Sequence, residues 1–277
     1  EYIVATINNG GGFYTPETYI NEARILDANI HAPCVNNSGK LTKIYNQEIF
    51  LGLNMIYELN DEIIQKIEST KSKNGSFKSF NDFINKVHIP TKQLNLLIRI
   101  GAFRFTNKTK KELLWESCLK GSLPKPNGSS KLLFKTNKNY TISNLEYHEN
   151  EDAFDELELL GFPLCSPFSI IERKPKSYIK VKNMKKHLHK KTTMMGYLIS
   201  VKKTVTKKGE FMYFGTFTDE DGAFLDSIHF PKIADKYPFI GKGVYELKGK
   251  VTSEFDFYSL EVNCMQKIYY KKDKRYS

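Results

Sequence analysis

The sequence predicts an α+β protein with several domains, in which a helical region precedes a small five-stranded β-barrel. Two observations carry this prediction. Between residues 51 and 119, apolar residues recur at three- and four-residue intervals, which is typical of amphipathic helices. From Thr192 to Ile268, short runs of β-branched and aromatic residues instead alternate with turn residues. A chain of 277 residues is long enough for about two domains of roughly 150 residues each.

The turns between the β-rich runs define the barrel. Two tight turns, Lys207–Gly209 and Asp219–Gly222, each join neighbouring strands. A helical piece at Pro231–Ile240 and the turn Gly241–Gly243 lead into the fourth strand. Five strands with a helix after the third are typical of the OB-fold, a barrel that binds single-stranded nucleic acid or sugars. We expect this domain at residues 174–270, followed by a basic tail at 271–277.

The charge of the chain favours a polyanionic partner. The net charge is +11 and the pI is near 9.2, and no apolar run approaches the ~20 residues that span a bilayer. We therefore expect nucleic acid as the partner and no membrane. Residues 174–209 contain many lysines and no Asp or Glu. The run reaches the first barrel hairpin, so we predict backbone contacts there from Lys202, Lys203, Lys207 and Lys208, the alternative being a solvated face.

Aromatic residues follow these lysines in the second predicted strand. Alternation places Phe211 and Tyr213 on one face and Met212 and Phe214 on the other. With Met212 and Phe214 in the core, Phe211 and Tyr213 are predicted to stack on bases; packing inside the barrel is the alternative. Gly215 is expected to form a bulge that returns the end of the strand to the core.

The helical region contains a hairpin signal. The apolar stripe of Leu94, Leu97 and Ile98 runs directly into Ile100–Phe103, and a helix resumes at Lys110. This order is typical of a helix-hairpin-helix unit. We predict that the backbone N–H groups of Gly101 and Ala102 hold a duplex phosphate. An ordinary corner with a glycine helix cap is the alternative.

Residues 120–173 are predicted to be a linker. Its first part is rich in Pro, Gly, Ser and Asn and contains the apolar knot Lys131–Phe134, which suits either docking into a partner's groove or packing on its own domain. The acidic helix Glu151–Leu160 is interpreted as a solvated face.

The triplet Asp219–Asp221 is interpreted as a turn rather than a metal site, and four scattered cysteines without a C-x-x-C pair predict no zinc site.

Several motifs in the same order carry a resemblance to a known family. They are NNGGGFYTPETYINEAR, HAPCVNNS, GSFKSFNDFINKV, LLIRIGAF, ELELLGFPLCSPF and TKKGEFMYFGTFTDEDG. The chain resembles the C-terminal part of the bacterial replicative DNA polymerase III alpha family. The resemblance implies the end of the fingers region at 1–50, a tandem helix-hairpin-helix domain at 51–119 and a clamp-binding peptide with Leu132, Leu133 and Phe134. The first hairpin departs from the family, with Glu58 and Asn60 at the two glycine positions.

The resemblance also implies that the catalytic groups of the family lie outside this chain. In the family, the carboxylates that hold catalytic Mg²⁺ lie in the palm, upstream of the matching segment, so we predict no catalytic residue, metal ligand or cofactor here. We expect the chain to begin within a longer, cytoplasmic polypeptide. The predicted function is DNA binding and clamp tethering, with single-stranded template, duplex backbone, sliding clamp and other replicase subunits as partners. Alternatives are an OB-fold module that binds only proteins, or one half of a split polymerase.

Overall fold

The computed structural model describes residues 1–121, 149–255 and 257–275, and the chain divides into two compact units. A helical unit contains Asn29–Leu164, and a barrel unit contains Tyr2–Ala28 together with Cys165–Ser277. Residues 2–28 and 29–50, predicted as one segment, therefore fall in different units. The predicted clamp peptide, with Leu132, Leu133 and Phe134, lies outside the described residues.

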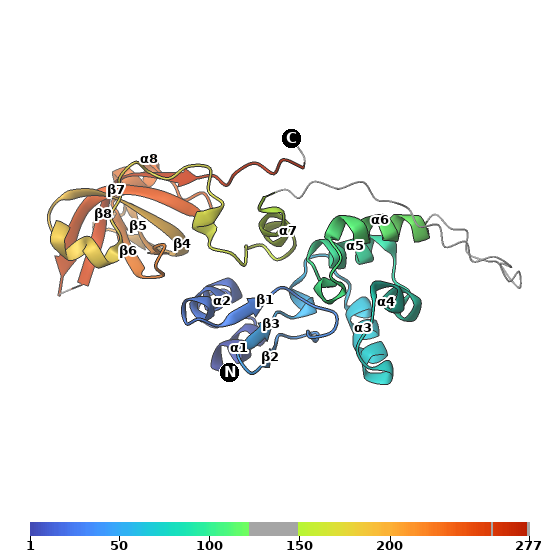
Figure 1. Cartoon of the computed structure of the whole chain (residues 1–277). Helices are drawn as coiled ribbons and strands as arrows, with labels where there is room; N and C mark the ends of the chain where they lie inside the picture. The colour runs from blue at the N-terminus through green and yellow to red at the C-terminus, as the bar shows by residue number, and fades with distance from the viewer. Residues whose placement is uncertain (122–148, 256, 276–277) are drawn as a thin grey trace, which may run out of the picture. The chain divides into compact units, whose positions relative to one another are not determined.

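The helical unit starts with a three-stranded sheet and continues with helices (Figure 1). The strands are β1 (Asn29–His31), β2 (Lys43–Tyr45) and β3 (Glu48–Phe50), with β3 in the centre, parallel to β1 and antiparallel to β2. After η1 (Leu53–Met55) the helices are α3 (Asp61–Asn74), α4 (Phe80–Val87), α5 (Thr91–Arg99), η2 (Arg104–Thr106), α6 (Lys110–Gly121) and α7 (Glu151–Leu159).

The predicted apolar stripes form the core of this unit. Ile64, Ile67, Phe83 and Leu97 are all fully buried. The ring of Phe103, directly after the second hairpin, packs 4.9 Å from that of Phe83, edge to face. This packing fixes the hairpin to α4.

A lysine holds the loop between β1 and β2. The Nζ of Lys71, on α3, donates hydrogen bonds to the carbonyl oxygens of Val35, Asn36 and Ser38 at 3.3, 3.2 and 2.6 Å. Burial lowers the pKa of Lys71. One ammonium group thus satisfies three carbonyl groups of the loop, which would otherwise lack hydrogen-bond donors.

The barrel unit begins with α1 (Tyr2–Asn8) and α2 (Pro16–Ile25), and η3 (Pro167–Ser169) and η4 (Val181–His187) precede the barrel. The strands are β4 (Lys191–Val205), β5 (Phe211–Thr218), β6 (Phe224–His229), β7 (Val244–Glu254) and β8 (Phe257–Ile268), with α8 (Pro231–Lys236) between β6 and β7. They close in the order β4-β5-β6-β8-β7, and only β6 and β8 pair in parallel. This connectivity is that of the OB-fold and confirms the predicted fold class.

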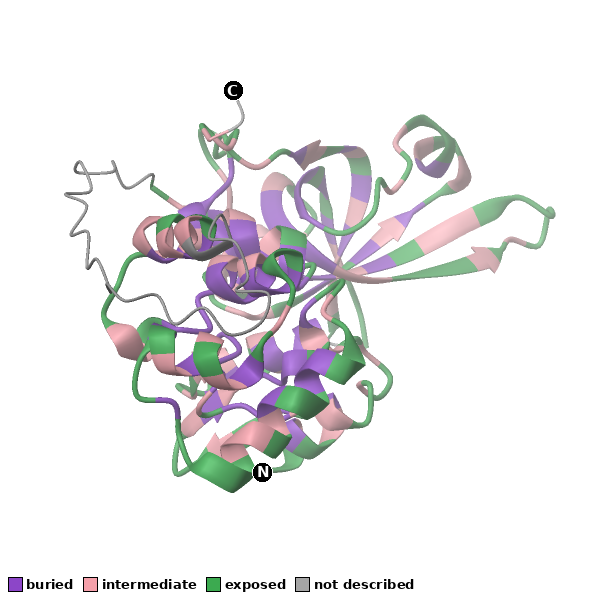
Figure 2. Cartoon of the chain, turned by 90° about the vertical axis from the view of Figure 1, so that its right-hand side faces the viewer, coloured by how far each residue is buried: buried purple, intermediate pink, exposed green. Residues whose placement is uncertain are grey.

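The barrel closes around buried side chains, which are coloured purple in Figure 2. Phe217, Tyr245, Leu247 and Leu260 are fully buried. The α2 helix is attached to the barrel through the buried carboxylate of Glu17, which accepts hydrogen bonds from the Tyr197 hydroxyl and the Lys242 ammonium group. The amino-terminal helices therefore belong to the barrel unit through a polar contact that no local pattern predicts.

Candidate nucleic-acid interface

The hairpin of β4 and β5 presents the predicted lysines on a short loop. Val205 pairs with Phe211, and the N–H of Thr206 donates to the Glu210 carbonyl at 2.8 Å, so three residues form the loop. Gly209 ends it at φ +83°, the left-handed conformation that three-residue hairpin loops require. This geometry places Lys207 and Lys208 at the tip of the hairpin.

All four predicted hairpin lysines are exposed, and none forms an ion pair with a carboxylate of the described residues. Lys202 and Lys203 lie on opposite faces of β4, because successive side chains of a strand alternate. The Nζ of Lys203 lies 3.4 Å from the ring centroid of Phe211, which is 48% exposed. Phe211 is therefore at the surface beside a cation, as predicted.

Three of the lysines that precede the barrel are, by contrast, paired with the acidic turn. Lys180 and Lys182 both contact the Asp221 carboxylate, at 2.5 and 2.8 Å, and Lys174 contacts Glu220. Hydrogen bonds from Lys180 and Lys182 lower the pKa of Asp221. Asp219 accepts the N–H groups of Asp221 and Ala223, both at 3.0 Å, which confirms the predicted turn. These contacts use part of the basic run for structure, whereas Lys185, Lys186 and the hairpin lysines form no ion pair within the described residues.

The predicted core face of β5 is wrong. The inward face carries Tyr213, Gly215 and the fully buried Phe217, and the Tyr213 ring lies 6.1 Å from that of Phe239 beside the core. Phe214, predicted to be buried, is 40% exposed and pairs across the strands with Lys202. Outward-facing Phe214 thus joins Lys202 on the strand face with which OB-folds hold their ligands.

Gly215 is not a bulge. It pairs in continuous register with Val201 and Ser227, and the bulge lies in β4 between Leu198 and Ser200. A Cβ at Gly215 would meet the Phe217 ring and the Ser227 hydroxyl, both at 2.8 Å. The glycine makes room inside the crowded barrel and leaves the direction of the strand unchanged.

A second barrel hairpin carries exposed aromatic residues that the sequence prediction missed. At the tip between β7 and β8, Phe255 is 89% exposed and Phe257 is 80% exposed. Phe255 has φ +49°, which is rare for a bulky residue. The signal was present in the sequence, since two phenylalanines flank a polar residue at a turn between strands. This is the loop between strands four and five of the fold, a second contact region of OB-folds.

The second helical hairpin is closed by a helix cap. Gly101 has φ +77°, its N–H donates to the Ile98 carbonyl at 2.9 Å, and the Ala102 N–H donates to the Leu97 carbonyl at 2.8 Å. This pair of bonds is a Schellman cap of α5. The prediction that these two N–H groups are free to hold a phosphate is therefore wrong. Ala102 is also fully buried.

The first hairpin has its backbone groups occupied as well. Glu58 takes the left-handed conformation, with φ +61°. Gln93 accepts the Asn60 N–H at 2.8 Å and donates to the Glu58 carbonyl at 2.9 Å. The Tyr57 N–H donates to the Leu159 carbonyl at 2.7 Å. The backbone groups of Tyr57, Glu58 and Asn60 are therefore bonded within the protein, as are the N–H groups of Gly101 and Ala102 in the second hairpin.

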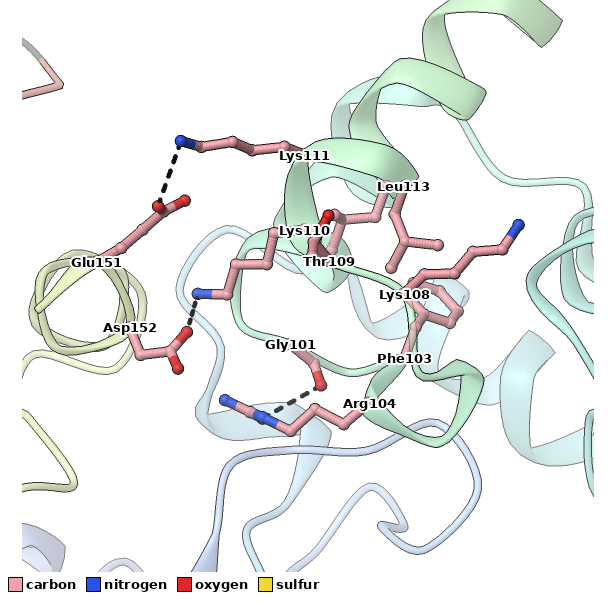
Figure 3. A pocket seen from close by; sticks show the side chains of 11 residues that line it. Gly101, Phe103, Arg104, Lys108, Thr109, Lys110, Lys111, Leu113, Glu151 and Asp152 are labelled. Atoms are coloured by element: carbon pink, nitrogen blue, oxygen red, sulfur yellow. Dashed lines mark hydrogen bonds and ion pairs between the residues drawn. The ribbon is translucent and has the colours of Figure 1, made fainter. Parts of the chain in front are cut away.

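Basic side chains surround the start of α6. A cavity of about 220 Å³ is lined by Arg104, Lys108, Lys110 and Lys111 (Figure 3). Thr109 and Glu112 form a reciprocal capping box, in which the Glu112 carboxylate accepts the Thr109 N–H at 2.7 Å, and this bond lowers the pKa of Glu112. The start of α6 thus gathers basic side chains, and Glu151 and Asp152 of α7 line the same cavity.

Two other classes of site find no support. Within residues 1–121, 149–255 and 257–275, no three His, Cys, Asp or Glu side chains are grouped to hold a metal ion. In the same ranges, no helix is both long and apolar enough to cross a bilayer.

Comparison with known proteins shows which sequences this chain resembles. The helix-hairpin-helix motif family matches residues 27–113. The DNA polymerase III alpha subunit of Borreliella burgdorferi is 28% identical over 274 residues, which cover 90% of this chain and 24% of that protein. The alpha subunit of Aquifex aeolicus is 27% identical over 78% of this chain and 18% of its own length.

Error-prone DNA polymerases are similar over a shorter stretch. That of Mycobacterium tuberculosis is 31% identical over 106 residues, 38% of this chain and 10% of that protein. The chain thus spans from about a tenth to about a quarter of these relatives. Among solved structures, the second OB-fold domain of replication protein A from Methanococcus maripaludis aligns with 31% of this chain and 91% of that domain, at 16% identity and a TM-score of 0.23. The chain is homologous to the C-terminal helix-hairpin-helix and OB-fold region of DNA polymerase III alpha subunits and error-prone DNA polymerases.

Proposed function

We propose that this region binds DNA for a replicative polymerase, and that its barrel holds single-stranded template. The observation that carries the proposal is the β4–β5 hairpin. Lys202, Lys203, Lys207 and Lys208 are exposed there beside Phe211 and Phe214. Lysines that lack a carboxylate partner are available to phosphates, and exposed rings offer a stacking surface to any base.

Binding of this kind does not depend on base sequence. Each phosphate that a lysine neutralises releases counterions from the strand, so affinity falls as salt rises. Phe214 lies on the outer strand face, whereas Tyr213 faces Phe239. Phe214 therefore replaces Tyr213 as the second stacking residue, and Phe211 keeps the role predicted for it.

The proposal extends to the whole protein in three further respects. Duplex backbone contacts would come from the lysines around the start of α6. Tethering to a sliding clamp would come from Leu132, Leu133 and Phe134, which lie outside the described residues. The similarity to the alpha subunits supports contacts with other replicase subunits in the cytoplasm, and polymerisation in the presence of the remaining parts of such a polymerase.

Alanine variants of the two phenylalanines test the proposal. We expect Phe211→Ala and Phe214→Ala each to weaken binding of a fluorescent oligothymidylate by about 1–3 kcal/mol, the usual contribution of one stacked base. Tyr269→Ala, which removes a 63% exposed aromatic ring of the same unit outside the hairpin, is the matched control. If both hairpin variants bind like this control, the barrel does not hold the strand with these two rings.

A second candidate function is a protein-binding barrel. Phe255 and Phe257, the most exposed of the barrel's described phenylalanines, favour it, because apolar side chains at a hairpin tip suit a partner's pocket. In that case Phe257→Ala would weaken association with a replication protein and leave oligonucleotide affinity unchanged.

A further inference from the structure

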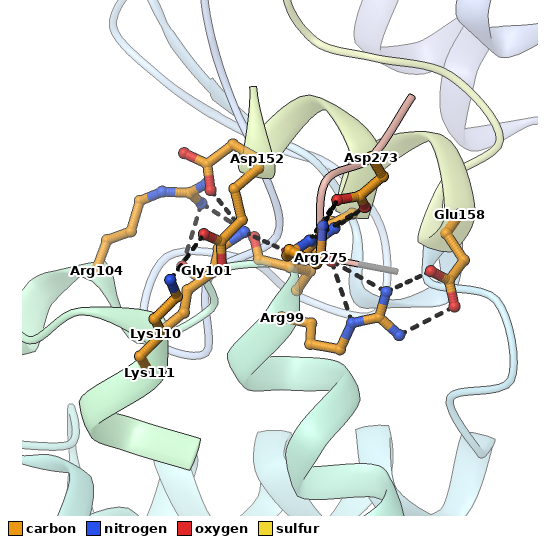
Figure 4. Close-up of polar contacts among 12 residues, drawn as sticks. Arg99, Gly101, Arg104, Lys110, Lys111, Asp152, Glu158, Asp273 and Arg275 are labelled. Carbon is orange, nitrogen blue, oxygen red and sulfur yellow. Dashed lines mark hydrogen bonds and ion pairs between the residues drawn. The ribbon is translucent and has the colours of Figure 1, made fainter. Parts of the chain in front are cut away.

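The α7 helix presses its carboxylates onto the cationic surface of α5 and α6 (Figure 4). Its acidic face was predicted to be solvated, and this prediction is wrong. The Asp155 side chain is fully buried and accepts hydrogen bonds from Arg99 Nε and Nη2 at 3.1 and 3.0 Å, and from Lys110 Nζ at 2.8 Å. One buried anion thus holds two cations of the second helix-hairpin-helix element.

Further pairs flank this centre. Asp152 contacts Lys110 at 2.6 Å, and the Glu158 carboxylate accepts a bond from Arg99 Nη1 at 3.0 Å. The bond with Glu158 raises the pKa of Arg99 above its ordinary value. Residues 152, 155 and 158 are three apart, so their carboxylates follow one helix face at intervals of roughly 4.5 Å along the axis. The pairs therefore form a row of anions facing a row of cations.

The same segment closes the first hairpin. The Leu159 carbonyl at the end of α7 accepts the Tyr57 N–H at 2.7 Å. Gly161 follows at φ +86°, and a Cβ there would lie 2.5 Å from the Tyr57 hydroxyl oxygen. The segment from Glu151 to Gly161 thus occupies a backbone donor of the first hairpin and two cations beside the second, groups of the kind that contact a duplex backbone.

We propose that α7 is a built-in acidic occupant of the duplex-phosphate surface of the helical unit, so that a duplex binds there only as α7 leaves. The inference rests on the proposed DNA-binding function. Removing α7 alone leaves Arg99 and Lys110 without their anions, which is costly for partly buried cations. A phosphate backbone supplies replacement anions, so the exchange keeps each cation paired. Lys108 points away from α7 and is paired with Glu116 on α6, so its charge does not depend on α7 (Figure 3).

Neutralising the exposed carboxylates of α7 tests the exchange. The double variant Asp152→Asn/Glu158→Gln removes two pairs whose carboxylate side chains are 47% and 57% exposed, and it leaves buried Asp155 in place. We expect the full chain with these changes to bind a blunt DNA duplex about tenfold more tightly. The control Glu172→Gln/Asp235→Asn makes the same charge change at exposed positions of the barrel unit. Equal duplex affinity of the two double variants, or no duplex binding by either, overturns the proposal.

Hydrogen exchange gives an independent readout in the unaltered chain. On addition of the duplex, the amides of residues 151–159 are expected to exchange faster, because α7 leaves its site, while those of α3 do not. Unchanged or slower exchange in α7 under saturating duplex shows instead that the helix is a permanent part of the unit. Titration of both double variants with oligothymidylate separates this outcome from failure of the proposed function, which would abolish single-strand binding in both.

Discussion

At the scale of single residues, His229 shows how the barrel interior treats a titratable group. It is fully buried, and its Nε2 lies 2.9 Å from the Ser227 hydroxyl, which itself donates to the Gly215 carbonyl. Its Nδ1 finds no hydrogen-bond partner among the described residues. Burial lowers the pKa of His229 to about 4. The neutral imidazole is thus the form that the fold accepts.

This histidine predicts acid sensitivity of the barrel. Because the folded pKa is lowered, the unfolded chain binds a proton first, so His229 destabilises the fold as pH falls from about 6.5 to about 4. Over this range the free energy of unfolding falls by about 3 kcal/mol, at ~1.4 kcal/mol per pH unit. His229→Phe should remove this decrease: urea unfolding at pH 7 and pH 4 would show a smaller pH effect in the variant. An equal effect in both proteins would contradict the assignment.

At the scale of elements, α7 carries a second buried acid. Glu156 is 6% exposed, and its carboxylate accepts the Leu164 N–H at 2.8 Å. Burial raises its pKa to about 6, against the smaller opposing effect of that hydrogen bond. The end of α7 is therefore held best when Glu156 is protonated.

The sign of the effect follows from the raised pKa. The unfolded chain loses this proton near pH 4.5 and the folded chain near pH 6, so stability falls as pH rises between the two values. Glu156→Gln keeps an acceptor for Leu164 and has no charge. We expect it to stabilise the helical unit by about 2 kcal/mol at pH 8 and by nothing at pH 4. Thermal unfolding at the two pH values checks this, and a destabilised variant at pH 8 would show that the ionised carboxylate is needed.

The elements were largely predictable from local patterns, and their mutual contacts were not. The spacing of apolar residues alone reveals a helix or a strand. It was therefore enough to predict the helix that carries Leu94, Leu97 and Ile98 and the five strands of the barrel. Alternation in β5 separates Phe211 and Tyr213 from Phe214, but it does not tell which face is inside. That choice depends on Phe239, whose ring lies 6.1 Å from Tyr213 and which comes from the segment after α8.

In the candidate site, too, local patterns predicted some features, and contacts between distant residues were missed. The exposed hairpin lysines were predicted from charge and turn position. The pairing of Lys180 and Lys182 with Asp221 joins residues about 40 apart in the chain, and no local pattern encodes it. The contacts of Asp155 with Arg99 and Lys110 were missed for the same reason, because an acidic helix with an apolar stripe is usually solvated on its polar side.

At the scale of the whole molecule, charge pairing separates cations with structural partners from cations that remain exposed. The chain has a net charge of +11, yet the acidic turn takes up lysines ahead of the barrel and α7 takes up cations of the helical unit. The β4–β5 hairpin keeps its lysines without carboxylate partners in the described residues. A net charge of this size favours polyanions, and in the proposed account the hairpin contacts the strand because it combines unpaired lysines with exposed aromatic rings.

The salt dependence of single-strand binding tests this account most directly. We would measure the dissociation constant of an oligothymidylate at several salt concentrations for the unaltered chain and for Lys207→Ala/Lys208→Ala. Each phosphate contact contributes about 0.7 to the slope of log affinity against log salt, so the double variant should lose about 1.4 of that slope. Lys185→Ala/Lys186→Ala, two exposed lysines of η4, is the control and should lose little of it. The same slope in the hairpin variant as in the unaltered chain would contradict strand binding by this hairpin.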